Sequence, residues 1–162
     1  MSDQTEAPIN RLPAITWALA LPMIAMEIVL QLGASGVAGG PEAVGWRIDA
    51  ITRLAFVPDL WREMLSLGQF PPEHLARVVG YAFVHGNLTH TVFAVVILLA
   101  LGKFVGEVIA PLNRDGDEIG AQWADGAVTM PPGFKAAYQA FWQSGWPALA
   151  ARAEDGGQGL PS

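Results

Sequence analysis

Two long apolar segments constrain the fold of this chain more than any other feature. The first covers residues 12–32 and the second covers residues 78–102. At ~1.5 Å of rise per residue, a helix over the first segment extends roughly 31 Å, enough to cross the hydrocarbon core of a bilayer. Charged residues make up only 15 % of the chain, whereas soluble chains average roughly 25 %. The pattern predicts two transmembrane helices; for the first segment, the alternative is a buried helix of a soluble protein.

Polar residues interrupt both apolar segments. Pro22 and Glu27 lie in the first, and the first half of the second contains His85, Asn87, Thr89 and His90. Polar side chains at membrane depth usually face a bundle interior or a water-filled cavity. Glu27 is compatible with a bundle interior or with the interface. The histidines are equally compatible with solvated positions at the interfacial end of a helix.

The stretch between the segments shows helical rather than strand periodicity. Apolar residues recur at helical spacing in residues 41–56 and 58–68, and Arg47, Arg53 and Arg62 alternate with them. Short helices with Trp on one side and Arg on the other suit a membrane surface. Pro71-Pro72 is the expected start of the second long helix, since proline is tolerated in the first turn.

The chain changes character near Pro111 and becomes richer in Gly, Pro and charge. One apolar stripe at helical spacing follows, formed by Phe134, Tyr138, Phe141, Trp142 and Trp146. It predicts a helix near residues 133–146 in a tail that is otherwise loosely ordered. The expected fold class is therefore all-α: two transmembrane helices linked by interfacial helices, followed by that tail with one short amphipathic helix.

Composition also excludes several classes of function. The chain has no Cys, which rules out a disulfide scaffold, a thiolate metal site and a cysteine nucleophile. Its net charge of −6 offers no basic surface for nucleic acid. The expected partners are the lipid bilayer and the transmembrane helices of other proteins, and neither a cofactor nor a metal is expected. The expected location is a membrane, most simply a bacterial inner membrane.

One motif gives the first part of the chain a family resemblance. The segment RVVGYAFVHGNLTHTVFAVVILLALG, at residues 77–102, resembles the second transmembrane helix of rhomboid intramembrane serine proteases. Arg77, His85, His90 and the Leu101-Gly102 pair stand at motif positions, while Ala94 replaces the family's Asn. The resemblance covers about residues 12–106. It implies that His85 lies beside the oxyanion of the tetrahedral intermediate, with His90 packing behind it and Arg77 in the preceding loop.

The same resemblance implies a catalytic Ser-His pair that this chain lacks. The family takes its serine from a GxSG motif and its base from a later His, but no His and no GxSG follow residue 102. Ser144, in the sequence WQSGW, has no base after it. Covalent serine catalysis needs both the nucleophile and the base, so a protease inactive in this chain is expected.

The tail resembles the early N-terminal part of an acyl-CoA dehydrogenase. The motifs occur in the family's order: APLNR-x-GD from Ala110, DG-x-VT from Asp125, P-GFK-x-AY from Pro132, and GGQGLP from Gly156. In that family the flavin site and the catalytic glutamate come later in the sequence. FAD is therefore implied only if the tail belonged to a complete dehydrogenase.

Two unrelated resemblances thus meet near residues 102–111, and they predict a chimeric or truncated chain. The expected domains are a rhomboid-like membrane region at 1–106 and an acyl-CoA-dehydrogenase-like fragment at 107–162. Three functions remain open: an inactive membrane protein of rhomboid type, a fragment of a soluble flavoenzyme, and a membrane-anchored interaction protein that uses the stripe from Phe134 to Trp146.

Overall fold

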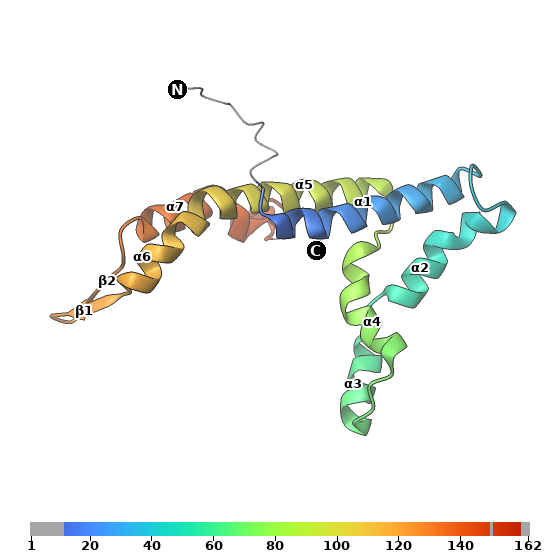
Figure 1. Ribbon diagram of the computed structural model, residues 1–162, viewed down its shortest axis with the longest axis horizontal. Helices are drawn as coiled ribbons and strands as arrows, with labels where there is room; N and C mark the ends of the chain where they lie inside the picture. Colours follow the sequence, from blue (N-terminus) through green and yellow to red (C-terminus); the bar gives the residue numbers. More distant parts are fainter. Residues whose placement is uncertain (1–11, 150, 160–162) are drawn as a thin grey trace. The chain divides into compact units, whose positions relative to one another are not determined.

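The computed structural model describes residues 12–149 and 151–159, and they fall into two compact units. The N-terminal unit ends at Lys103 and the C-terminal unit begins at Phe104. Helices dominate the described residues, in agreement with the sequence-based prediction (Figure 1).

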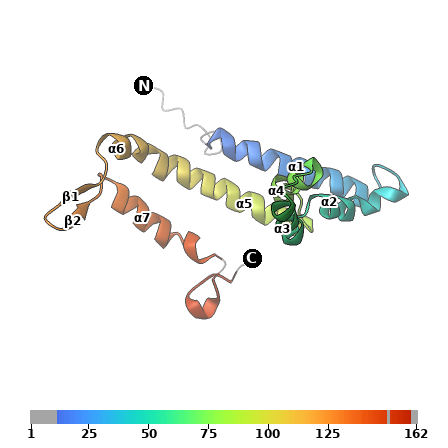
Figure 2. The ribbon, with the colours of Figure 1, turned by 90° about the horizontal axis from the view of Figure 1, so that it is seen from below.

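The N-terminal unit is built on two long helices with shorter helices between them. Its helices are α1 (Ala14–Ala34), η2 (Pro41–Gly45), α2 (Trp46–Leu54), α3 (Pro58–Leu67), α4 (Pro72–Gly80), η3 (Tyr81–Phe83) and α5, which starts at Leu88 and ends at Phe104. Helix α1 continues through Pro22 without a break. The expected helices between the long segments are confirmed, and α1 and α5 lie side by side (Figure 2).

Helices α1 and α5 are antiparallel, and a glycine allows their close approach. A Cβ atom at Gly102, near the end of α5, would collide with the Thr16 side chain near the start of α1. At the opposite end of the pair, the Thr91 hydroxyl donates a hydrogen bond to the Glu27 carboxylate. Small residues at helix contacts are typical of packing within membranes.

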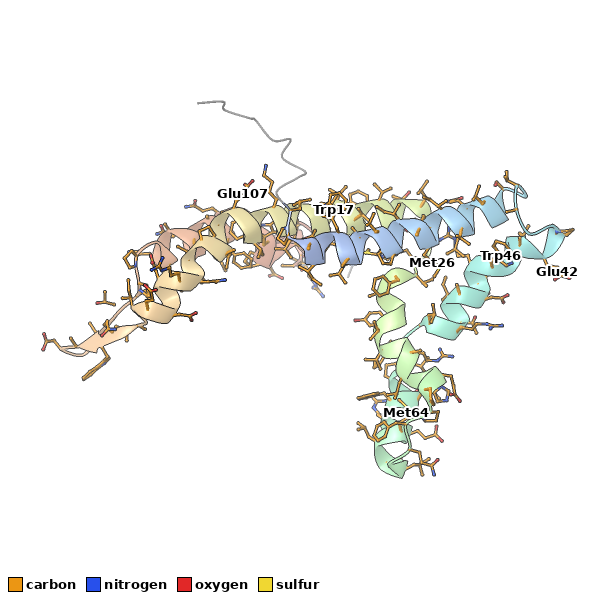
Figure 3. All side chains as sticks on the ribbon, viewed as in Figure 1. Trp17, Met26, Glu42, Trp46, Met64 and Glu107 are labelled. Carbon is orange, nitrogen blue, oxygen red and sulfur yellow. The ribbon has the colours of Figure 1, made fainter. Side chains whose placement is uncertain are left out.

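Trp46 closes the turn between α1 and α2. A Cβ atom at Gly33 would lie 2.7 Å from Trp46 Cε3, and one at Gly39 would collide with the same indole ring. Gly39 also has a positive φ of 79°. The chain therefore needs glycine twice here to place the Trp46 ring, which is labelled at the start of α2 in Figure 3.

The predicted start of the second long helix is wrong. The structure places residues 72–80 in the separate helix α4, and α5 begins only at Leu88, not near residue 78. Asn87 explains the new start, because its side-chain oxygen accepts a hydrogen bond of 2.9 Å from the His90 amide. This is an N-cap contact, which favours a helix beginning at the next residue. His85 consequently lies in the loop before the helix.

The helical backbone also continues beyond the predicted end at residue 102. After α5 it passes through a π-helical turn, η4 (Val105–Ile109), then a 3₁₀ turn, η5 (Ala110–Leu112), and finally α6 (Asn113–Glu118). Pro111 accounts for this change of winding, because proline lacks an amide proton and its ring clashes with the carbonyl four residues earlier.

A β-hairpin in the C-terminal unit corrects the all-α prediction. Strands β1 (Gln122–Ala124) and β2 (Ala127–Thr129) pair antiparallel, with Trp123 opposite Val128. Asp125 and Gly126 form the two-residue loop with φ values of 52° and 77°. Two positive φ values are the signature of a type I′ turn, and Asp-Gly is a strong sequence signal for it.

The predicted tail helix is confirmed as α7 (Phe134–Gln143), which is followed by the 3₁₀ turns η6 (Trp146–Ala148) and η7 (Ala153–Asp155). Phe141 packs against Phe104 with ring centroids 6.1 Å apart. Phe134 lies close to Gly116. Loose order in this tail stays a prediction. The end of the GGQGLP motif lies outside the described residues.

Candidate functional site: a buried carboxylate joined to a histidine loop

The Glu27 carboxylate is the centre of the most connected polar group in the N-terminal unit. Arg47 binds it through both arms of its guanidinium: Nη2 donates to Oε1 at 2.8 Å and Nη1 donates to Oε2 at 3.0 Å. Gln31 Nε2 donates to Oε1 at 3.1 Å, and the Thr91 hydroxyl donates to Oε2 at 2.8 Å. We call Glu27, Gln31, Arg47 and Thr91 the Glu27 cluster.

Burial makes this cluster energetically important. The Arg47 and Glu27 side chains are only 17 % and 6 % exposed. A buried charge is tolerated when it is paired and its remaining hydrogen-bonding positions are filled. Each Glu27 oxygen accepts two hydrogen bonds, so the carboxylate has no free acceptor site for a further polar partner. Of the two positions left open for Glu27 by its sequence, the structure selects the interior.

Arg47 also fixes the loop that carries His85. Its Nη1 atom donates a second hydrogen bond, of 2.8 Å, to the His85 carbonyl oxygen. One guanidinium therefore connects α2, where Arg47 lies, to α1 and to the loop before α5. The hydrogen bonds that Arg47 donates to the Glu27 carboxylate raise the pKa of its guanidinium, so this link carries a full positive charge.

His85 and His90 form a close pair of imidazoles. Their ring centroids are 5.0 Å apart, and the planes meet at 78°, edge to face. Burial lowers the pKa of His85, and the nearby positive charges of His90 and Arg47 lower it further, while Glu27 acts in the opposite direction. The Nδ1 atom of His85 is buried with no hydrogen-bond partner among the described residues.

An open hollow of about 440 Å³ adjoins this pair. Both imidazoles line it together with Ile51 of α2, Phe56 of the loop after α2 and Tyr81 of η3. These two rings pack with centroids 6.1 Å apart. The arrangement offers hydrogen-bonding nitrogens at the edge of an apolar surface, and no serine, threonine or cysteine lines the hollow.

Arg77 takes a different position from its two predicted companions. Its Nη1 atom donates to the Ala55 carbonyl at 3.0 Å, which fastens α4 to the end of α2. The Ser144 hydroxyl donates to the Ala140 carbonyl at 2.6 Å, one turn back in its own helix. The structure thus brings His85 and His90 together, and it shows Arg77 and Ser144 in backbone contacts. No group of three or more metal-ligating side chains occurs within residues 12–149 and 151–159.

Sequence reasoning missed Arg47 as a member of the site. It placed Arg47 on a surface-lying helix and left the partner of Glu27 open. A buried acid in an apolar helix implies a cationic partner, but three arginines in the following stretch were equal candidates. Only the fold brings Arg47 to Glu27, because the Trp46 turn directs the start of α2 back along α1.

Comparisons with known proteins support one of the two resemblances. A stretch of 60 residues is 50 % identical to 3-methylmercaptopropionyl-CoA dehydrogenase of Ruegeria pomeroyi. It covers 37 % of this chain and 10 % of that protein, so the match spans about a tenth of the relative's length. The acyl-CoA dehydrogenase motifs of this sequence lie in the C-terminal part of the chain. No protein-family model matches the chain. No solved structure matches it.

The rhomboid resemblance of residues 12–106 receives no support from these comparisons. For this part of the chain the structure shows two helices, Ala14–Ala34 and Leu88–Glu118. Both are long and apolar enough to cross a membrane. The roles of His85, His90 and Arg77 remain predictions.

Proposed function

We propose that this chain is an integral membrane protein that anchors an acyl-CoA-dehydrogenase-like segment at the membrane. In this proposal α1 and α5 are antiparallel spans, and α2, α3 and α4 lie at the membrane surface. The observation that carries the proposal is the Glu27 cluster: the Glu27 carboxylate of α1 is neutralised by Arg47 of α2 and accepts a hydrogen bond from Thr91 of α5, and the other surfaces of α1 and α5 are largely apolar.

The distribution of burial favours lipid over water around these helices. In α1, only 28 % of an apolar stretch of 18 residues is buried. In the helix that begins at Leu88, only 6 % of the corresponding stretch is buried. A core helix of a soluble protein would have most of such a stretch covered. Leu21, Ile28 and Phe93 are all more than half exposed. Contiguous apolar surface on this scale marks a membrane or protein interface.

The dehydrogenase-like segment enters the proposal through its 50 % identity to the Ruegeria protein. The described residues of this segment do not fit a flavin site. Its two arginines lie at the surface and pair with neighbouring acids, Arg114 with Glu118 and Arg152 with Glu154. The β-hairpin is exposed on both faces. We therefore assign no redox step to this chain.

A rhomboid-type role rests only on the residues that carry the resemblance. The His85–His90 contact is compatible with it, but no GxSG motif and no histidine follow residue 102 to supply the family's Ser-His pair. Peptide-bond hydrolysis is therefore not part of the proposed function.

Single-cysteine labelling tests the proposal directly, because the natural chain contains no Cys. Three variants of the full chain, Ser66→Cys, Val96→Cys and Thr129→Cys, are expressed in bacterial membranes and treated with a membrane-impermeant maleimide. We expect carbonate-resistant membrane association, reaction of Ser66→Cys and Thr129→Cys from opposite sides, and reaction of Val96→Cys only after denaturation. Release of the chain by carbonate, or reaction at Val96→Cys in intact membranes, would falsify the proposal.

A further inference from the structure

The surface between α1 and α5 contains a groove that the Glu27 cluster does not fill. It has a volume of about 220 Å³ and is lined by Ile24 and Ile28 of α1 and by Leu88, Val92, Val95 and Val96 of α5. Glu27 and Thr91 also contribute to its wall. We call this the α1–α5 groove.

We propose that the α1–α5 groove binds one acyl chain of a bilayer lipid. This inference rests on the proposed function, because it requires α1 and α5 to lie in the membrane. It goes beyond general lipid contact, since it assigns a particular site to a single hydrocarbon chain.

The polar atoms of the groove already use their hydrogen-bonding positions within the protein, so none is left for a polar ligand. Glu27 already accepts four hydrogen bonds, from Arg47, Gln31 and Thr91. The single hydroxyl proton of Thr91 is directed to Glu27 at 2.8 Å, the shorter of its two contacts. A polar group entering the groove would lose its hydrogen bonds to water without replacement, which is unfavourable. Only a hydrocarbon occupant avoids this cost.

The shape of the groove selects a thin chain rather than another helix. An α-helix with its side chains is about 10–12 Å across and approaches another helix closely in a membrane where small residues lie. Gly102, the small residue at which α5 meets Thr16 of α1, lies at the other end of the helix pair. The groove is instead lined by β-branched side chains such as Ile28, Val92 and Val96, whose χ1 angles are stiff in a helix. Against these bulkier side chains another helix cannot approach as closely as it could at small residues, so the groove favours a thinner occupant.

The volume suits part of an acyl chain. An apolar cavity of about 150 Å³ in another protein binds benzene, and the groove is larger than this. It is also open along the helix pair, so the rest of the chain and the headgroup can continue into the bilayer. Binding would bury apolar side chains such as Val92 and Val96 that are half exposed in the protein alone.

Photolabelling of the full chain tests this inference. The protein is reconstituted into phosphatidylcholine nanodiscs that contain a phosphatidylcholine analogue with a diazirine in the middle of one acyl chain. Peptide mass spectrometry then maps the adducts. We expect labelling concentrated on the groove residues and weaker on Leu21, Val29 and Phe93, which are exposed apolar residues of the same helices but do not line the groove.

Two matched variants separate a specific groove from general lipid contact. Val96→Phe fills the groove, whereas Val29→Phe adds the same ring to a non-groove position of similar exposure, 49 % against 55 % for Val96. We expect groove labelling to fall to the background of the other exposed residues in Val96→Phe and to stay unchanged in Val29→Phe.

Three outcomes would overturn the acyl-chain site, and they differ in what they say about the proposed function. Uniform labelling of groove and non-groove residues would remove the site and leave the membrane spans in place. Labelling of Leu21, Val29 and Phe93 with none on the groove residues would show that protein, not lipid, covers the groove. Absence of lipid adducts on both helices would also remove the proposed function, which carbonate extraction tests separately.

Discussion

The two units differ in how far apart in sequence their interacting polar side chains lie. In the N-terminal unit, Glu27 bonds to Arg47 and Thr91, which are 20 and 64 positions away. In the C-terminal unit, the described ion pairs join residues four and two positions apart, Arg114 with Glu118 and Arg152 with Glu154. In the first unit, the tertiary fold therefore brings together the partners of the buried polar groups. In the second unit, the ion pairs form between near neighbours in sequence and lie at the surface.

This difference predicts contrasting responses to substitution. Removing one member of the Glu27 cluster leaves other members buried without partners, and the damage spreads over three helices. Removing one member of an exposed local pair leaves the other in water. Exposed ion pairs contribute about 0–1 kcal/mol, whereas breaking a buried pair costs about 3–5 kcal/mol.

Arg47→Ala should have the largest effect. It leaves the Glu27 carboxylate buried with two of its four donors gone, and it frees the His85 carbonyl from its hydrogen bond. We expect a loss of about 3–5 kcal/mol in the free energy of unfolding of the N-terminal unit. Equilibrium unfolding in detergent micelles, followed by tryptophan fluorescence, measures it.

Arg62→Ala is the matched control, because Arg62 pairs with Asp59 three residues away and both side chains are exposed. A change below about 0.5 kcal/mol is expected there. The double variant Glu27→Leu/Arg47→Met should recover much of the lost stability, because replacing a buried pair by apolar residues is often neutral. Equal losses in Arg47→Ala and Arg62→Ala would contradict a buried ion pair.

Gly102→Val should have the next largest effect, by forcing α1 and α5 apart. A side chain at Gly102 collides with Thr16, and overpacking of this kind costs about 1–3 kcal/mol. Distances between spin labels on the two helices should increase along with the loss of stability. Gly45→Ala is the control, since nothing lies within 4 Å of a Cβ atom at that position. An unchanged label distance in Gly102→Val would show that the two helices do not meet there.

Gly126→Ala should disturb the C-terminal unit and leave the N-terminal unit unaffected. Gly126 has a φ of 77°, and an L-residue with a side chain pays about 1–2 kcal/mol in this left-handed region. We expect weaker cross-strand NOEs between Trp123 and Val128, with no change in the unfolding of the N-terminal unit. Asp125→Asn is the control, because Asn-Gly also favours the type I′ turn. Loss of stability in the N-terminal unit would contradict the independence of the two.

Local sequence signals predicted most of the helices, including those between the long segments and α7. They did not predict the break at residues 84–87, because Pro71-Pro72 gave a stronger start signal than the Asn87 cap, although the cap was readable from the sequence. The hairpin was also readable, since Asp125-Gly126 favours a type I′ turn. It was taken only as part of the dehydrogenase motif.

The contacts between helices could not be predicted from the sequence, for a physical reason. Glu27 and Arg47 were both noted, but helical spacing fixes only which residues share a face of one helix. It does not tell which arginine of the following helices reaches Glu27. The stripe in α7 shows the same limit: Phe141 packs within its unit, whereas Tyr138 and Trp142 are 66 % and 63 % exposed. Helical periodicity predicted that these residues share one face of α7, but it could not tell which of them would be buried.

The pH dependence of the N-terminal unit should show the smallest effect. Burial and the charges of His90 and Arg47 lower the pKa of His85 in the folded protein. The unfolded state, with a His pKa of about 6.5, therefore binds more protons as the pH falls below that value. Stability is then retained at higher pH, falls as the pH drops through this range, and stops falling below the lowered pKa of the folded state.

His85→Gln should flatten this pH dependence. His90→Gln should reduce it, because removing the charge of His90 lets the pKa of His85 rise toward its ordinary value. NMR titration of the imidazole Cε1 protons measures the pKa of His85 in the natural chain and in His90→Gln. A His85 pKa that does not rise in His90→Gln would show that the 5.0 Å contact between the rings carries no electrostatic coupling. The lowered pKa of His85 would then come from burial and the charge of Arg47, and the protonation of His85 would not depend on His90.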